Sequence, residues 1–152
     1  MALKDDAKII DLNIDGIQKQ RFRINGDPNS IIELNTSDMG IGDRLQTGLQ
    51  KLQEKMSEIA ELSDDDEELS DKMKKANEVM CEWVDYIFDS PISQVLSKGG
   101  TMYDPKDGMF RYEHIIDGLT KLYSDNINKE YKAIQARIKK HTSKYAGKKK
   151  GK

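Results

Sequence analysis

The sequence has few of the residues on which most chemical sites depend. Its 152 residues include one cysteine and two histidines. A single cysteine cannot form a disulfide within the chain, and His114 and His141 lack the neighbouring ligands that a four-coordinate zinc site requires. We therefore predict no metal site and no cofactor, and we interpret Cys81 as a small buried apolar residue.

Motifs for catalysis and nucleotide binding are also absent. The segments Asn25-Gly26-Asp27 and Gly40-Ile41-Gly42 lack the Lys-Ser/Thr pair of a phosphate-binding loop and the full dinucleotide fingerprint, so we interpret both as turns. Neither histidine lies in a motif that suggests a partner for a nucleophilic serine. The sequence thus predicts a protein that is not an enzyme and has no catalytic residue.

Long apolar runs are absent as well. No stretch is long and apolar enough to cross a membrane, and the first residues do not follow the pattern of a signal peptide. We therefore expect a cytoplasmic protein without a membrane partner. Hydrophobic residues make up 36% of the chain and charged residues 34%, which at this length predicts one domain with a modest core and long polar faces.

The N-terminal part contains three short segments in which apolar and polar residues alternate: 9–14, 18–24 and 31–34. Such alternation is typical of half-buried strands. A three-residue loop with Gly16 in the left-handed conformation, and a second loop at 27–29 with Asn29 able to take a positive φ, would place their apolar residues on one face. Those residues are Ile10, Leu12, Phe22, Ile24, Ile32 and Leu34. We predict a three-stranded antiparallel meander, which helices must cover to make it stable.

Two amphipathic runs follow the meander. The first carries apolar residues at steps of four and three, which share one face of a helix. These are Leu45, Leu49, Leu52, Met56 and Ile59. The second run, from Leu69 to Ile87, repeats the pattern and includes Trp83. Gly48 costs the first helix roughly 1 kcal/mol relative to Ala, which a close backbone contact there would explain. The two runs predict a helical hairpin.

The segment between the two runs is strongly acidic. Its five consecutive acids are Asp64, Asp65, Asp66, Glu67 and Glu68. A negative group at the start of a helix gains about 0.3 to 1 kcal/mol from the helix dipole, so we interpret the run first as the N-terminus of the second helix. The alternative is an acidic edge that faces a partner. The spacing does not match a calcium-binding loop.

The remaining residues predict further helices and a basic end. Ser90-Pro91 is typical of the N-cap and first residue of a short helix, and the segment 104–108 predicts turns. From Arg137 onward there are eight Lys or Arg and no acid. Clustered positive charge is a feature of nucleic-acid binding, but we favour a solvated face because the acidic run and the net charge of -2 would repel such a partner.

The predicted fold class is α+β, mostly α, with the small meander packed on the helical hairpin and a long C-terminal helix. A single domain is expected over 1–145, followed by a disordered basic tail at 146–152. Its parts are the meander (1–36), helix one (38–62), helix two (64–89), a short helix (91–97) and the C-terminal helix (109–145).

The segment Arg21–Asp38, with the sequence RFRINGDPNSIIELNTSD, and the helical part after it resemble small proteins encoded in the tail modules of phages and prophages of Gram-positive bacteria. Those proteins are similar to tail assembly chaperones. The resemblance implies a viral protein that acts in the cytoplasm of the bacterial host and is absent from the mature virion. It also implies that the protein binds amphipathic helices of the tape measure protein and recruits tail tube subunits.

Under this hypothesis the stripe of Leu45, Leu49, Leu52 and Met56 would bind a client helix or a second copy of the chain. Two other functions stay open. A phage-encoded inhibitor of a host nucleic-acid enzyme, of the anti-CRISPR type, would present the acids Asp64, Asp65, Asp66, Glu67 and Glu68 to a basic channel. A structural tail protein would instead be part of the finished particle.

Overall fold

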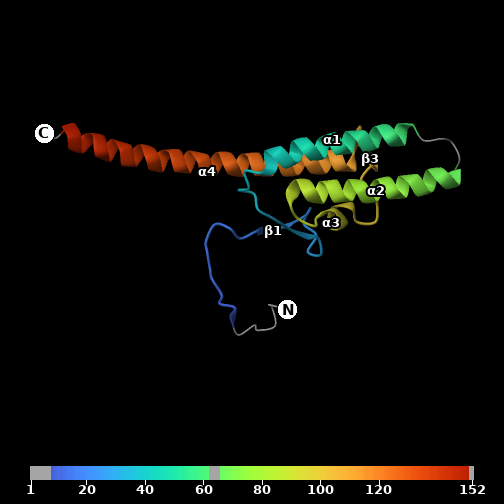
Figure 1. Ribbon diagram of the computed structural model, residues 1–152, viewed down its shortest axis with the longest axis horizontal. Coiled ribbons are helices and arrows are strands. Elements are labelled where there is room, and N and C mark those ends of the chain that lie inside the picture. Colours follow the sequence, from blue (N-terminus) through green and yellow to red (C-terminus); the bar gives the residue numbers. More distant parts are fainter. Residues whose placement is uncertain (1–7, 62–65, 151–152) are drawn as a thin grey trace.

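The computed structural model describes residues 8–61 and 66–150, and within them all side chains except those of 59, 60, 66–68 and 143–150. Its mostly helical α+β architecture agrees with the prediction at that level (Figure 1). The elements in chain order are β1 (Gln20–Arg23), β2 (Ile31–Leu34), α1 (Ile41–Ala60), α2 (Asp66–Phe88), α3 (Ser93–Ser97), β3 (Pro105–Lys106), β4 (Met109–Phe110) and α4 (Arg111–Lys150).

The prediction of a three-stranded meander is wrong, because the N-terminal sheet of the described chain has two strands. β1 and β2 pair antiparallel with Phe22 opposite Ile32, so these apolar residues share one face as predicted. The pairing is shifted by two residues from the register of a loop at 27–29, in which Ile24 would lie opposite Ile32. Residues 9–14 form no strand, and their apolar side chains are exposed. Alternation shows only that one face of a segment is apolar. A strand also needs a hydrogen-bonding edge and a layer that covers this face, and in the described chain residues 9–14 neither pair with the free edge of β1 nor pack under a covering layer.

The chain reverses between β1 and β2 at other residues than we predicted. Asn25 and Gly26, with φ of 51° and 75°, take the left-handed conformation that we expected at Asn29. The Asp27 carboxylate accepts hydrogen bonds from the Asn29 N–H (3.0 Å) and the Ser30 hydroxyl (2.7 Å), and it pairs with Lys98 directly after α3. The loop is thereby tied to the helical part of the molecule.

The core lies between α1, α2 and the first half of α4, which run side by side in Figure 1. The expected close contact at Gly48 is confirmed, because a Cβ at this position would collide with the Ile87 side chain of α2. Phe88 of α2 meets Tyr123 of α4 with ring centroids 5.8 Å apart. Ile32 and Leu34 of β2 join the same buried cluster, so the small sheet is an extension of the helical core.

The segment after α2 differs from the prediction at Ser90-Pro91. Ile92 is the N-cap of α3, and it makes no side-chain capping bond. The Ser90 hydroxyl instead donates to the Glu33 carbonyl oxygen of β2 at 2.6 Å. Asp85 accepts from the Ser93 N–H at 2.7 Å and thus holds the start of α3 against α2. The prediction of Ser90 as N-cap is wrong, because its hydroxyl connects the segment after α2 to the sheet instead of capping α3.

The predicted turns at 104–108 belong to a small hairpin of β3 and β4. Asp107 and Gly108 form its two-residue turn with φ of 54° and 76°, a conformation that Asp-Gly favours. α4 then runs as one 40-residue helix, and neither Gly118 nor the polar residues 124–128 interrupt it. Residues 146–150, which we predicted to be a disordered tail, continue α4 because lysine propagates a helix well once it has formed. Residues 151–152 lie outside the described chain.

Candidate partner-binding surface

The stripe predicted on helix one belongs largely to the core. Leu52 is fully buried, and Leu45, Leu49 and Met56 are half-buried against the core cluster. These side chains pack α1 onto α2 in the single chain. The structure therefore brings the four predicted residues together, but on a face that the chain already covers.

The acidic run can be placed only in part. Asp64 and Asp65 lie outside the described residues. α2 begins at Asp66, so Asp66, Glu67 and Glu68 occupy its first turn, where the helix dipole favours negative charge. The side chains of these three residues are not among those described.

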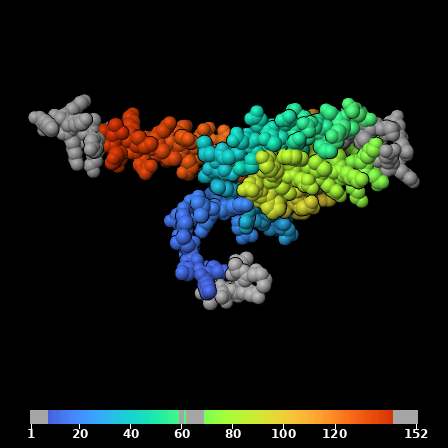
Figure 2. Space-filling model, in the orientation of Figure 1, coloured from blue at the N-terminus to red at the C-terminus, as the bar shows by residue number. Residues whose placement is uncertain are grey.

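An exposed apolar stripe lies instead on the outer half of α4. Tyr131, Ile134 and Ile138 are 48%, 41% and 54% exposed and follow one another at steps of three and four. We call these three residues the α4 stripe. They continue the helix face on which Tyr123 is buried and Ile127 half-buried. Figures 1 and 2 show why the exposure changes: α4 extends beyond the helical body, so α1 and α2 cannot cover its outer half.

The surroundings of the α4 stripe are basic. Residues 129–142 include five exposed Lys or Arg, whereas Glu130 is the one acid in this stretch of sequence. The five cations are Lys129, Lys132, Arg137, Lys139 and Lys140. Lys132, Arg137 and Lys139 lie to the sides of the stripe together with Glu130, while Lys129 and Lys140 lie on the opposite face of the helix. A stripe flanked mainly by positive charge suits an amphipathic partner with acids beside its apolar face. The sequence already contained Ile134 and Ile138 at helical spacing, but the spacing did not show that nothing covers them.

A cavity of about 290 Å³ lies at the inner end of the stripe. Tyr131 and Ile134 line one side, Met39 before α1 lines another, and Gly16 of the N-terminal segment closes it. Close by, the Asn126 side-chain amide donates to the Ser37 hydroxyl at 3.1 Å, which joins α4 to the same segment before α1. The stripe thus starts at a formed hollow and runs outward along the helix.

The second exposed apolar surface is the N-terminal arm, by which we mean residues 8–17. Its large apolar side chains range from 48% to 87% exposed. They are Ile9, Ile10, Leu12, Ile14 and Ile17. Figure 2 shows that the arm and the outer half of α4 leave the body at the same end.

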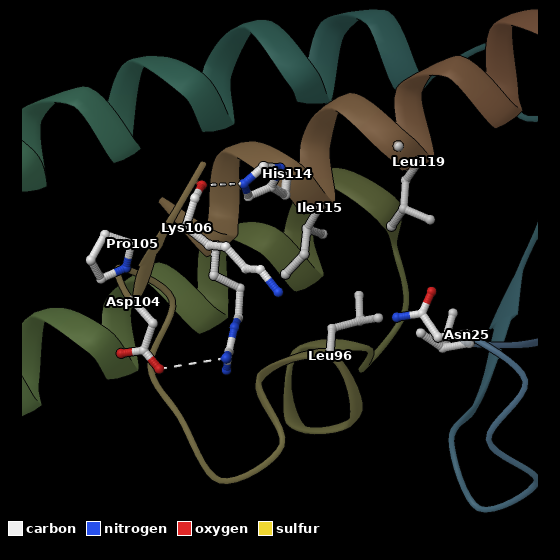
Figure 3. A pocket seen from close by; sticks show the side chains of 11 residues that line it. Asn25, Leu96, Asp104, Pro105, Lys106, His114, Ile115 and Leu119 are labelled. Carbon is white, nitrogen blue, oxygen red and sulfur yellow. Dashed lines mark hydrogen bonds and ion pairs between the residues drawn. The ribbon is translucent and has the colours of Figure 1, made fainter. Parts of the chain in front are cut away.

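A larger cavity, of about 700 Å³, lies between the β1–β2 loop, α3 and the start of α4 (Figure 3). Its polar groups bond to one another. Arg111 donates to the Ser97 carbonyl oxygen at 2.5 Å and pairs with Asp104 at 3.5 Å, and His114 Nε2 lies 2.8 Å from the Lys106 carbonyl oxygen. Hydrogen bonds from Thr101 lower the pKa of Asp104, so this carboxylate stays charged beside the arginine. These contacts hold the β3–β4 hairpin on α4, while the side chains of Asn25 and Lys106 line the cavity without taking part in them.

Chemical reactivity finds little support in the described residues. Cys81 is buried as predicted, and burial raises the pKa of its thiol, an effect that the nearby Asp85 carboxylate strengthens. Such a thiol is a poor nucleophile. Within 8–61 and 66–150, no group of three or more His, Cys, Asp or Glu side chains could hold a metal ion. In the same part of the chain, no helix is both long and apolar enough to span a membrane.

Comparisons with protein-family models, with curated proteins and with solved structures found no match to this chain.

Proposed function

We propose that this protein is a non-enzymatic tail assembly chaperone, which holds amphipathic helices of a tape measure protein and brings tail tube subunits to them. The α4 stripe carries this proposal. It is an apolar line on a projecting helix, it is flanked by cations, and it starts at a cavity that can accept one side chain. These properties favour a helical client with acids beside its apolar face. The proposed place of action is the host cytoplasm.

The small size of the stripe predicts weak binding by each copy. From Tyr131 to Ile138 the helix rises by about 10 Å, which is two turns and enough for two or three anchoring side chains of a client. A tape measure protein offers many such segments along one chain. Several copies bound to one client gain strength from their effective concentration, so weak single contacts are compatible with stable coating.

The proposal moves the client-binding face away from helix one. Leu52 is fully buried, and opening the α1–α2 contact to admit a client would expose the core. The α4 stripe needs no such opening. We therefore assign client binding to Tyr131, Ile134 and Ile138 and a packing role to Leu45, Leu49, Leu52 and Met56.

The test is co-expression with the tape measure protein of the phage or prophage that encodes this chain. The unaltered chain should keep that protein soluble, and Ile134→Ser with Ile138→Ser should weaken binding about tenfold or more, because two apolar anchors are lost. Tyr86→Ser is the matched control, since Tyr86 is 43% exposed on α2 and should be replaceable without effect on the client. A client that stays insoluble with the unaltered chain would refute the chaperone function. Mass spectrometry of purified particles completes the test, because a chaperone should be absent from them.

A further inference from the structure

Two apolar surfaces of this chain stand uncovered at the same end of the molecule. The N-terminal arm has five large apolar side chains at 48% to 87% exposure, and the α4 stripe has three at 41% to 54%. Single exposed apolar residues are ordinary on a protein surface, but contiguous groups mark sites of interaction.

The arm and the stripe match in length. In an extended chain Ile10, Leu12 and Ile14 point to one side, and two successive residues of this set lie about 7 Å apart. The three therefore span about 13 Å. The α4 stripe rises by about 10 Å from Tyr131 to Ile138, so three side chains of the arm can lie along three side chains of the helix.

Their charges are complementary. The arm carries Asp11 and Asp15 against one cation, Lys8. On α4, Lys132, Arg137 and Lys139 lie to the sides of the stripe against one acid, Glu130. Long basic side chains keep their charged ends in water while their stems cover apolar surface, so they can reach past the apolar contact to these carboxylates. The opposite charges would fix the position of an arm on the stripe.

We propose that two copies of this chain exchange their N-terminal arms, each arm packing Ile10, Leu12 and Ile14 on the α4 stripe of the other copy. Gly16 lines the cavity at the inner end of its own stripe, yet the arm turns away from that stripe and stays exposed (Figure 1). Packing of the arm on another copy requires no change in the turn at Gly16. Because the contact is reciprocal, six apolar side chains of each copy are covered, on the order of 1,500 Å² in total if they are fully buried, which is the area of a standard stable interface.

This exchange goes beyond the proposed function and does not depend on it, because both surfaces belong to this chain. Its test therefore uses the isolated full-length protein without a client. A failure of the chaperone assay leaves this measurement unaffected. Because a client and an exchanged arm would share the α4 stripe, the arm variant, whose stripe is intact, tells loss of the dimer from loss of client binding.

The experiment is sedimentation equilibrium from about 1 to about 100 µM. The unaltered protein should form a dimer. An arm variant, Ile10→Ser with Leu12→Ser, and a stripe variant, Ile134→Ser with Ile138→Ser, should each raise the dimer dissociation constant about 100-fold, while Tyr86→Ser should leave it unchanged. All five positions are exposed in the single chain, so circular dichroism spectra of the monomers should match.

Mixing the two variants separates exchange from other modes of pairing. The arm variant keeps an intact stripe and the stripe variant keeps an intact arm, so their mixture restores one of the two contacts and should dimerise more tightly than either variant alone. A protein that stays monomeric at all concentrations would overturn the proposal. This holds even if hydrogen exchange shows a protected arm, because the arm would then pack on α4 of its own chain. A dimer that is lost only in the stripe variant would also overturn it, since that result means that two α4 helices pair with each other.

Discussion

Gly48 allows the sharpest test of how α1 and α2 pack. Replacing a glycine inside a helix by alanine normally stabilises the helix by about 0.5 to 1 kcal/mol. At Gly48 the new methyl group would occupy the space of the Ile87 side chain, in a core where Leu52 and Ile87 are fully buried. Overpacking of this kind costs about 1 to 3 kcal/mol. We therefore expect Gly48→Ala to lower the free energy of unfolding by up to about 2.5 kcal/mol after the helix gain is included, whereas a helix gain alone would raise it.

Gly118→Ala is the matched control. Gly118 lies within α4, and a Cβ built there has no atom within 4 Å, so this variant should show only the helix gain. Urea unfolding at 25 °C, followed by circular dichroism, gives both free energies. If Gly48→Ala is as stable as Gly118→Ala, α1 and α2 do not approach as the structure has them.

Combining Gly48→Ala with Ile87→Ala gives a second check. Ile87→Ala alone leaves a cavity and should cost about 2 to 5 kcal/mol. In the double variant the methyl group at position 48 can enter this space, so the double variant should be more stable than the sum of the two single losses predicts. Simple additivity would refute the contact between these two side chains.

Three further predictions concern titration and access. Burial raises the pKa of Tyr123 to about 12, so the folded state holds the phenolic proton more strongly than the unfolded state. The free energy of unfolding should therefore fall by about 2 to 3 kcal/mol between pH 10 and 12. Tyr123→Phe should show a smaller decline over the same pH range. The hydrogen bond from Lys98, followed by those from Asn29 and Ser30, lowers the pKa of Asp27 well below its usual value of 3.8. The contribution of this carboxylate to stability is therefore present above pH 4 and is lost as the pH falls. Lys98→Ala should weaken this acid dependence in urea titrations. Cys81 should react with a thiol reagent only at the rate of unfolding, and fast labelling of the native protein would contradict its burial.

The sequence predicted those parts of the fold in which local pattern and packing agree. The stripe on helix one and the pattern of helix two meet in the α1–α2 contact, and Gly48 marked the point of closest approach. Parity correctly placed Phe22 and Ile32 on one face of the sheet. The loop was wrong in two respects, because its positive φ lies at Asn25 and Gly26 and the strands pair two residues away from the predicted register. The apolar residues stayed on one face because the predicted and the observed loops both leave an odd number of residues between paired positions.

The candidate site was harder to predict, because a helical stripe is equally apolar whether its own chain or another molecule covers it. The stripe of α1 and the stripe of α4 follow the same spacing, yet Leu52 is fully buried and Ile138 is 54% exposed. What separates them is how far the neighbouring helices reach, and this is a property of the three-dimensional arrangement. The same reason explains residues 9–14, whose alternation predicted a strand that no edge of the sheet receives.

The outer half of α4 links partner binding to helix stability. An isolated helix shorter than about 12 to 15 residues is marginal in water, and most helices in proteins depend on packing of an apolar face. Beyond Asn128 every described side chain of α4 is exposed, so this part lacks such packing in the single chain. Covering Tyr131, Ile134 and Ile138 supplies it, whether the cover is an exchanged arm or a client helix. Amide hydrogen exchange of residues 129–142 should therefore slow when the stripe is occupied, whereas residues 112–123, already packed in the core, should not change. Equal exchange of 129–142 at low and high protein concentration, in a sample that dimerises, would show that the contact lies elsewhere.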